Sequence, residues 1–271
     1  MSIHPTAILN PKASIGKNVT IGPFAVIGPD VEIGDDCHIW PHTVMEYTRL
    51  GQGCQVFPQA SLGLAPQHLK YKGEPTRLEV GARTVFREGV TAHRGTALDQ
   101  SVTTIGSDCY FMALSHIAHD CRIGDKVIMA NGAQLAGHVH VGESTFISTT
   151  VGIHQFVRIG KGAMISGGAM VPLDVAPFCV AQGDRAEVKG LNIVGMRRMG
   201  LDRASIQLVK EAYKTMFMNG LTLAEALTKS DLLVGDPHVK VFRDFFLDTK
   251  RGYLRPSRSR TVPTDLEETV S

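Results

Sequence analysis

Four histidines near the middle of the chain have the spacing best suited to chemistry: His116, His119, His138 and His154. His119, Gly137 and Gln155 are 18 residues apart, and His138 and His154 are next to Gly137 and Gln155 in sequence. An imidazole that is neutral near pH 7 is a suitable general base for a hydroxyl group. We therefore predict a catalytic site in which these residues line one edge of the fold.

Two neighbouring residues are predicted to support a general base at His119. Asp120 could orient the imidazole, but consecutive residues of a strand point to opposite faces, so the two side chains would meet only at a corner. Gly137 has no side chain, and its backbone N–H is a candidate donor to a developing oxyanion. The pattern indicates general-base catalysis with oxyanion stabilisation.

Metal chemistry is an alternative interpretation of the same histidines. Three histidines on the edge of a β-helix and shared between subunits can bind Zn²⁺ and activate water, as in hexapeptide carbonic anhydrases. Gly137 and Gln155 interrupt the stack of histidines, which favours the general base. A zinc-dependent hydratase stays open as a second function, and a non-catalytic scaffold as a third.

A six-residue period must position these side chains. An aliphatic or aromatic residue occupies every sixth position from Ile105 to Val171, and the same period runs from Ile3 to Met45. Neither an α-helix nor an ordinary strand has this period. We predict a mainly β fold, a parallel β-helix in which three hexapeptides close each 18-residue coil. Coils stack about 4.8 Å apart, so residues 18 apart become neighbours.

The period is interrupted twice and then ends. Polar corner loops are predicted at about 63–79 and 97–104, and the composition of the first indicates a functional loop. The β-helix is predicted over 1–190, with its β pattern fading beyond Val180, a small α-helical C-terminal domain over 191–256, and a polar tail over 257–271.

Helical periodicity replaces the six-residue period from Asp202 onward. Thr222 and Glu225 have the spacing of a capping box, and Pro237 is expected to open a later helix that Gly252 ends. The apolar residues of the first and last of these helices are predicted to face a core: Ile206, Val209, Ala212, Tyr213 and Met216, then Val241, Phe242, Phe245 and Phe246.

Composition excludes several function classes. The net charge of +2 gives no electrostatic case for nucleic-acid binding. No 18-residue apolar run or signal peptide is present, so we expect a cytoplasmic protein without a transmembrane segment. Four cysteines fall at the small inward position of their hexapeptides, as expected for core residues in a reducing compartment: Cys37, Cys54, Cys109 and Cys121. Outer positions suited to trimer packing are Val151, Met164 and Met170.

Six segments resemble, in order and spacing, those of the UDP-N-acetylglucosamine O-acyltransferases, which open lipid A synthesis in Gram-negative bacteria. They are Ser115-His-Ile-Ala-His-Asp-Cys121, Leu135-Ala-Gly-His-Val139, His154-Gln-Phe156, Lys70-Tyr-Lys-Gly-Glu-Pro-Thr-Arg77, His93-Arg-Gly-Thr96 and Ala181-Gln-Gly183. The resemblance covers nearly the whole chain. It implies that the β-helix is left-handed.

The resemblance also implies an activity and its partners. The enzyme would be a homotrimer with active sites in the clefts between subunits. It would transfer a (R)-3-hydroxyacyl chain from acyl carrier protein to the 3-hydroxyl of UDP-N-acetylglucosamine. The thioester supplies the activation energy, so no bound cofactor is expected, and phosphopantetheine arrives on the donor. The acidic carrier protein would dock on a basic side of the helical domain: Lys210, Lys214, Lys250 and Arg251.

Site residues follow from the same resemblance. His119 would be the general base, Asp120 its orienting partner and Gly137 the oxyanion donor. Residues implied to bind the substrates are Gln67, His68, Lys70, His116, His138, His154, Gln155, Asn192 and Arg198, with His154 and Gln155 either entering from the neighbouring subunit or flanking the acyl chain. Gly167 and Gly168 stand where the family measures the acyl tail, and would admit a long one.

Three residues depart from the family pattern. His68 replaces a usual Asp, Val194 a usual Glu and Met199 a usual Arg. These departures affect sugar and nucleotide contacts, so transfer to a 3-amino sugar stays open as an alternative. The related N-acyltransferase that acts two steps later carries an extra N-terminal domain, whereas the six-residue period begins here at Ile3.

Overall fold

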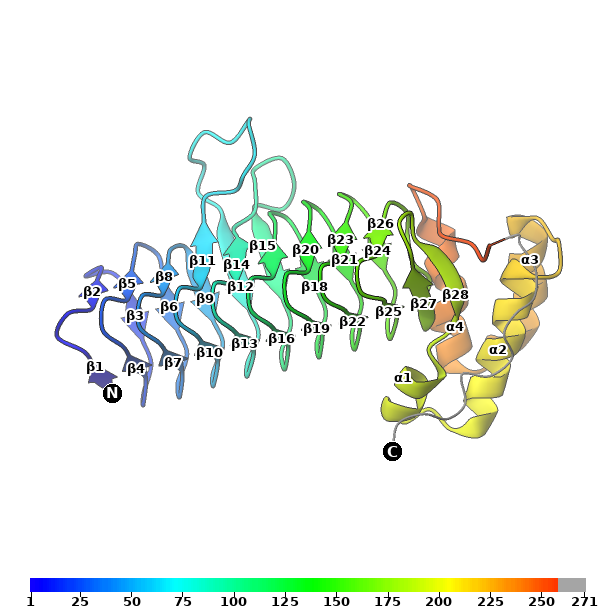
Figure 1. Cartoon of the computed structure of the whole chain (residues 1–271), viewed down its shortest axis with the longest axis horizontal. Helices are drawn as coiled ribbons and strands as arrows, with labels where there is room; N and C mark the ends of the chain where they lie inside the picture. Colours follow the sequence, from blue (N-terminus) through cyan, green and yellow to red (C-terminus); the bar gives the residue numbers. More distant parts are fainter. Residues whose placement is uncertain (258–271) are drawn as a thin grey trace.

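The computed structural model describes residues 1–257, which form an elongated prism of short strands with helices at its C-terminal end (Figure 1). Residues 258–271, nearly all of the predicted polar tail, lie outside the described residues, as does the side chain of Leu232. The strands form three sheets, one for each face, and each sheet takes every third strand of the chain as far as β27. This arrangement is the predicted parallel β-helix.

The three sheets are named A, B and C here. Sheet A has 11 strands: β1 (Ser2–Ile3), β4 (Thr20–Ile21), β7 (His38–Ile39), β10 (Gln55–Val56), β13 (Val85–Phe86), β16 (Tyr110–Phe111), β19 (Ile128–Met129), β22 (Phe146–Ile147), β25 (Met164–Ile165), β27 (Cys179–Gln182) and β28 (Glu187–Leu191). Sheet B has 9: β2 (Ile8–Leu9), β5 (Val26–Ile27), β8 (Val44–Met45), β11 (Ser61–Leu64), β14 (Thr91–His93), β17 (His116–Ile117), β20 (Gln134–Leu135), β23 (Gly152–Ile153) and β26 (Met170–Val171). Sheet C has 8: β3 (Ser14–Ile15), β6 (Glu32–Ile33), β9 (Thr48–Leu50), β12 (Arg77–Val80), β15 (Val102–Ile105), β18 (Arg122–Ile123), β21 (His140–Val141) and β24 (Arg158–Ile159).

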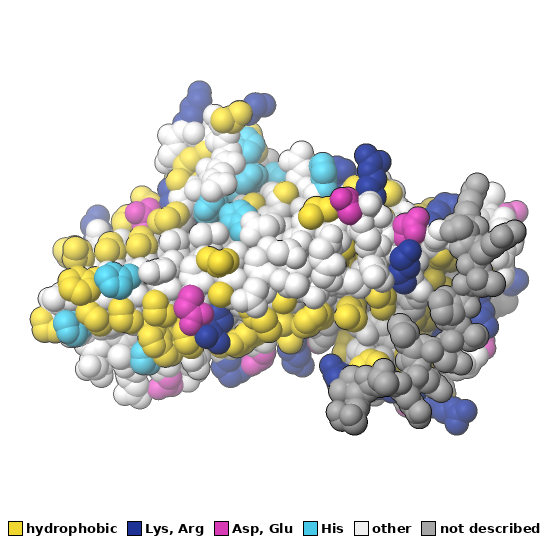
Figure 2. Space-filling model, in the orientation of Figure 1, with side chains coloured by type: hydrophobic (Ala, Val, Ile, Leu, Met, Phe, Trp, Pro, Cys, Tyr) yellow, Lys and Arg dark blue, Asp and Glu magenta, His cyan; other side chains and the backbone are white. Residues whose placement is uncertain are grey.

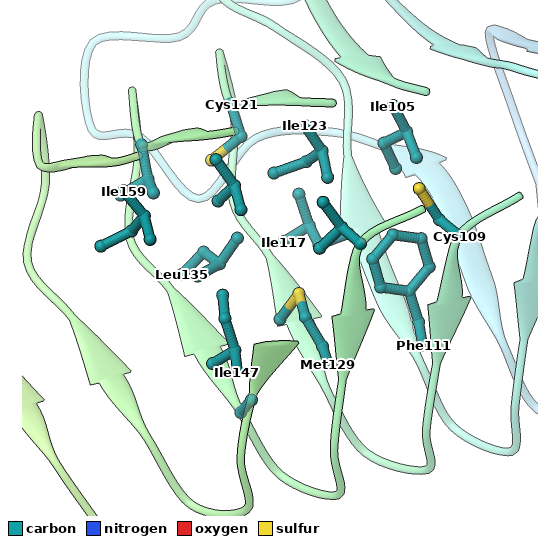
Figure 3. Close-up of a cluster of buried hydrophobic side chains, with 14 of the residues drawn as sticks. Ile105, Cys109, Phe111, Ile117, Cys121, Ile123, Met129, Leu135, Ile147 and Ile159 are labelled. Carbon is teal, nitrogen blue, oxygen red and sulfur yellow. The ribbon is translucent and has the colours of Figure 1, made fainter. Parts of the chain in front are cut away.

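The bulky residues of the six-residue period fill the interior of the prism (Figure 3). Ile117 and Leu135, from neighbouring coils, are both fully buried, whereas Ile3 in the first coil is 38% exposed because no earlier coil covers it. The four cysteines expected at small inward positions are buried, as is Cys179. Burial raises the pKa of the Cys109 thiol to about 11. These thiols therefore act as core residues.

The predicted ruler of 18 residues holds wherever the coils carry no insertion. Tyr110 pairs with Ile128 and Ile128 with Phe146. In each coil a corner residue adopts a left-handed backbone; at the corner between sheets B and C these residues are Asp120 and His138, each with φ of 61°. One coil near Tyr47 is a residue short, since Ile33 pairs with Leu50.

Two insertions project from one side of the prism, between β11 and β12 and between β14 and β15 (Figure 1). The first spans residues 65–76, inside the range 63–79, because both flanking strands extend into it. The second spans 94–101 and begins three residues before the range 97–104, because β15 starts at Val102 and pairs with β12 over four residues.

Beyond the last parallel coil the chain forms an antiparallel hairpin and then helices. β28 pairs antiparallel with β27, so the expectation that the β pattern fades beyond Val180 was wrong. The helical elements are α1 (Ile193–Arg198), α2 (Arg203–Phe217), α3 (Leu223–Ser230), η1 (Asp231–Leu233), α4 (Pro237–Asp244) and η2 (Phe245–Asp248). None of the helices within residues 1–257 is both long and apolar enough to cross a membrane.

The helices follow the predicted patterns with few exceptions. The five-residue apolar stripe lies on α2 and is buried, and Thr222 with Glu225 forms the capping box of α3. Short α1 was not predicted. Val241 was predicted to face the core, but it is 40% exposed because it is turned away from Val239 and Phe242 on α4. Val151 was predicted on an outer face, but it is buried at a small inward position.

Candidate active site

His119 and Asp120 meet at the corner between sheets B and C. The left-handed backbone of Asp120 turns its carboxylate back toward the preceding residue, and His119 Nδ1 lies 2.8 Å from Asp120 Oδ2. The exposed fraction is 8% for His119 and 1% for Asp120. The contact that a strand would forbid is therefore made at a corner.

Asp120 is held as a carboxylate by donors from the second insertion. The backbone N–H of Thr96 donates to Oδ1 and the Thr96 hydroxyl to Oδ2, each at 2.8 Å. Burial alone would raise the pKa of Asp120, but the hydrogen bonds from His119 and Thr96 outweigh it, and the pKa lies below its ordinary value. A carboxylate only accepts hydrogen bonds, so His119 Nδ1 carries the proton and Nε2 is left with a lone pair.

Gly137 lies one coil beyond His119, directly against the imidazole. A Cβ atom at position 137 would stand 2.6 Å from His119 Cε1 and 2.8 Å from Nε2. The Gly137 carbonyl accepts the amide of Phe156, while its own N–H has no acceptor among the described residues. A polarised backbone donor therefore lies beside the basic nitrogen of His119, as oxyanion stabilisation requires.

His138 lies behind the dyad of His119 and Asp120 rather than in front of it. Its Nδ1 is 3.2 Å from Asp99 Oδ2, its Nε2 is 3.8 Å from Asp120 Oδ2, and its ring stacks on Phe156. His138 is not among the residues that line the groove described below. A direct contact between His138 and substrate is therefore not apparent within one chain.

The zinc alternative would have to use His119, Asp120 and His138, whose ligand atoms lie within 4.8 Å of one another. Both Asp120 oxygens already accept hydrogen bonds from Thr96, and Oδ2 also accepts one from His119. An ion would compete with the bonds that orient the dyad. The donor set therefore suits a general base better than a metal centre.

A groove of about 920 Å³ runs from His119 along the outer face of sheet B. The strands β17, β20, β23 and β26 form its floor, and the first insertion forms one wall. Histidines gather beneath the projecting loop (Figure 2). The predicted residues that line it are Gln67, His68, Lys70, His116, His119, Gly137, His154 and Gln155. His154 and Gln155 thus line the same groove as His119 without a second subunit.

His116 is part of a buried polar group on the groove floor. Its Nδ1 lies 2.7 Å from the hydroxyl of Thr91, and burial lowers its pKa. His93 packs edge-on against His116 with ring centroids 5.0 Å apart, and burial lowers the pKa of His93 to about 4. Both imidazoles are therefore neutral near pH 7.

The first insertion is tied to the prism by Arg94. This guanidinium is 7% exposed and lies 4.3 Å from the centre of the Tyr47 ring. It donates to the Gly63 carbonyl at 2.8 Å and to the Tyr71 hydroxyl at 3.1 Å. The anchored loop brings the ring of His68, edge-on, to 5.1 Å from that of His119. The wall of the groove is thereby fixed in place.

The remaining predicted residues lie on other edges. The Asn192 side chain caps α1 by accepting the Gly195 amide at 2.9 Å, and donates to the Gly162 carbonyl, which lies at the corner between sheets C and A. Arg198 is exposed on α1. Gly167 and Gly168 lie at the corner between sheets A and B, outside the groove of the same chain.

Sequence reasoning assigned no role to Thr96, Asp99, His93 or Arg94, which surround the dyad and its groove. The segment His93-Arg-Gly-Thr96 was noted only as part of a resemblance. Its side chains reach the site across an insertion, so the 18-residue ruler could not align them. The segment itself, adjoining the break in the period, was the available signal.

Known proteins share this fold and much of this sequence. Residues 174–254 match the family described as Udp N-acetylglucosamine O-acyltransferase, Domain 2, and residues 12–46 and 103–137 match the bacterial transferase hexapeptide family. The acyl-[acyl-carrier-protein]–UDP-N-acetylglucosamine O-acyltransferase of Anaeromyxobacter sp. (strain Fw109-5) is 48% identical over 257 residues, 94% of this chain and all of that protein. The enzyme of the same name from Burkholderia orbicola (strain MC0-3) is 43% identical, over 93% of this chain and 99% of its own.

Solved structures agree with these relatives. LpxA from Acinetobacter baumannii has a TM-score of 0.90 at 42% identity, covering 93% of this chain and 99% of that one. The UDP-N-acetylglucosamine acyltransferase of Francisella novicida has a TM-score of 0.92 at 32% identity, covering 98% and 100%. The likeness in fold and the hexapeptide matches make the prism a left-handed β-helix. With identity of this level over nearly its full length, the chain belongs to the UDP-N-acetylglucosamine O-acyltransferase family.

Proposed function

We propose that this protein transfers a (R)-3-hydroxyacyl chain from acyl carrier protein to the 3-hydroxyl of UDP-N-acetylglucosamine, the reaction that opens lipid A synthesis. The observation that carries this proposal is the buried dyad of His119 and Asp120, 2.8 Å apart, with the Gly137 backbone against the imidazole. The relatives named for this reaction match nearly the whole chain.

The dyad and Gly137 account for each proton and bond of the transfer. Nε2 of His119 takes the proton of the sugar hydroxyl as its oxygen bonds to the thioester carbonyl carbon. The negative charge that develops on the carbonyl oxygen is stabilised by the Gly137 N–H, while Asp120 stabilises the imidazolium. As the intermediate collapses, the C–S bond breaks and the imidazolium returns the proton to the departing thiol of phosphopantetheine.

The groove offers a place for each substrate. The anchored loop contributes Gln67, His68 and Lys70 next to the dyad, where the sugar and its phosphates would lie. Neutral His116 can exchange hydrogen bonds with sugar hydroxyls. His154 and Gln155 flank the path of the acyl chain along β23 and β26. The thioester supplies the driving force, so the proposal requires no bound cofactor.

The proposed assembly is a homotrimer in the cytoplasm. Asn192 and Arg198 lie on a different edge from His119, which supports a nucleotide site completed by a neighbouring subunit. Outward residues of sheet A are apolar and half-buried within one chain: Val85, Ile128, Phe146 and Met164. A band of hydrophobic side chains along the lower side of the prism suits such an interface (Figure 2). Lys210, Lys214, Lys250 and Arg251 are the proposed docking side for acyl carrier protein.

Transfer from hydroxyacyl-carrier protein to UDP-N-acetylglucosamine tests the proposal, with the wild-type protein and His119→Ala. We expect His119→Ala to lose about 10²- to 10⁴-fold in kcat/KM. His42→Ala is the matched control, because His42 is exposed and stacks only on Phe24. No transfer by the wild-type protein, or full activity of His119→Ala, would overturn the proposal.

Two further arms separate the alternatives. Transfer restricted to a 3-amino analogue of the sugar would overturn the hydroxyl acceptor while leaving the acyl-transfer centre in place. Activity lost to a chelator and restored by zinc would overturn the general-base mechanism. We expect the hydroxyl sugar to be acylated and the rate to be insensitive to chelation.

A further inference from the structure

We infer that Thr96 is a positioning residue, which decides that Asp120 serves His119 rather than His138. This inference rests on the proposed general-base function of His119. Thr96 belongs to the second insertion, yet it is only 2% exposed because the insertion folds back onto the corner between sheets B and C. Its two donors are used on one carboxylate, at 2.8 Å each.

The need for such a residue follows from a competition between two imidazoles. Asp120 Oδ2 lies 2.8 Å from His119 Nδ1 and 3.8 Å from His138 Nε2. The torsion that rotates an aspartate carboxylate is broad, so the side chain alone does not fix its direction. A small rotation would bring Oδ2 within hydrogen-bonding distance of His138 and leave Nδ1 of His119 without an acceptor.

Thr96 fixes that rotation at both oxygens. The backbone N–H restrains Oδ1, and the hydroxyl donates to Oδ2, the same oxygen that accepts His119. The same insertion also restrains the competing imidazole, since Asp99 lies 3.2 Å from His138 Nδ1. On the other side, the Asp120 amide donates to Thr103 Oγ1 at 2.8 Å and fixes the backbone but not the carboxylate.

Thr96→Val tests the role of the hydroxyl, because it keeps the shape of the side chain and the backbone N–H. We expect kcat to fall by about ten- to a hundredfold, the loss typical of one hydrogen bond to a charged group. Thr96→Ser keeps the hydroxyl, and we expect it to retain most of the activity. Equal losses in the two variants would overturn the inference.

The titration of the two histidines, followed by NMR in the full-length protein, gives a readout that simple destabilisation would not produce. When Asp120 turns from His119 to His138, the imidazolium of His119 loses its partner and that of His138 gains one. In Thr96→Val we therefore expect the pKa of His119 to fall and that of His138 to rise, each by roughly one unit. The other imidazoles that face His119, those of His68, His93 and His116, are unchanged in both variants.

A matched control perturbs the same corner without touching the carboxylate. Thr103→Val removes the acceptor of the Asp120 amide, and we expect it to lower the thermal midpoint with no opposite movement of the two pKa values. If Thr96→Val behaves like Thr103→Val, Thr96 is merely structural and the inference is wrong. The titration needs no substrate, so an inactive wild-type protein would count against the proposed function and not against the role of Thr96.

Discussion

The imidazole of His119 lies against the α-carbon of Gly137, one coil further along the prism. A Cβ atom at position 137 would stand 2.6 Å from Cε1 of His119, closer than real Cβ contacts come. Space next to the imidazole, rather than backbone conformation, therefore requires glycine at this position. The six-residue period allows many residues there, so the requirement comes from the site and not from the fold.

Gly137→Ala should consequently impair catalysis far more than folding. The new methyl group would push the imidazole away from Asp120 and from the Gly137 N–H, because a side chain yields more easily than the stacked backbone. We expect kcat to fall by about a hundredfold or more, in the range seen when an oxyanion donor is lost, with a small change in the thermal midpoint. Activity assays and thermal unfolding measure the two effects.

Gly235→Ala is the matched control for that substitution, since a Cβ atom there would have no neighbour within 4 Å. We expect this variant to keep full activity. A Gly137→Ala protein that unfolds well below the wild type would indicate a packing role for Gly137 instead.

His93 should make stability depend on pH. Burial lowers its pKa from 6.5 to about 4 in the folded protein, so the native state holds the neutral imidazole. The unfolded chain takes up a proton as the pH falls below 6.5, so the stabilisation is complete above that value and is lost between pH 6.5 and 4. The contribution is about 3 kcal/mol at most. Urea unfolding near pH 7.5 and pH 5, at one protein concentration, measures it.

His93→Gln removes the titrating group and should flatten this pH dependence, whatever it does to stability at pH 7.5. Buried His116 and His140 also have lowered pKa values, so part of the dependence should remain. An identical loss of stability toward pH 5 in His93→Gln and wild type would rule out His93 as a source.

The sequence predicted the fold and the central stack of the site because both depend on one period. A repeat of six fixes the coils, and a coil of 18 residues aligns His119, Gly137 and Gln155. The same argument failed for Thr91 and His116, which pair across the second insertion although they are 25 residues apart. An insertion changes the ruler, and its length in sequence does not tell where its side chains fold back.

The contact between His119 and Asp120 also lay beyond sequence reasoning, for a reason of backbone geometry. Strand alternation separates consecutive side chains, whereas the left-handed conformation of Asp120 turns its side chain toward His119. The period predicts that a corner is near residue 120 but not which residue of the corner has positive φ. Asn192 illustrates the opposite error, since its expected nucleotide contact is partly occupied by capping α1.

Met170 marks the end of the groove and should limit the length of the acyl chain. His116, Gln134, Gly152 and Met170 follow one another on neighbouring strands of sheet B, so Met170 lies roughly 14 Å from His116. Its sulfur would be 2.7 Å from a Cβ atom on Gly152, and the side chain, 43% exposed, therefore projects along the groove floor.

Met170→Gly should shift donor preference toward longer chains. In a competition between C10 and C14 hydroxyacyl-carrier proteins, we expect the ratio of kcat/KM for C14 over C10 to rise by about tenfold or more, because each buried methylene adds favourable contact once the obstruction is removed. Gly167→Met is the informative comparison, since the family pattern assigns the measurement of the tail to positions 167 and 168. If Gly167→Met alters the ratio and Met170→Gly does not, the acyl chain leaves the groove toward the corner between sheets A and B. A change confined to Met170→Gly would instead mean that the chain follows sheet B and stops where Met170 crosses Gly152.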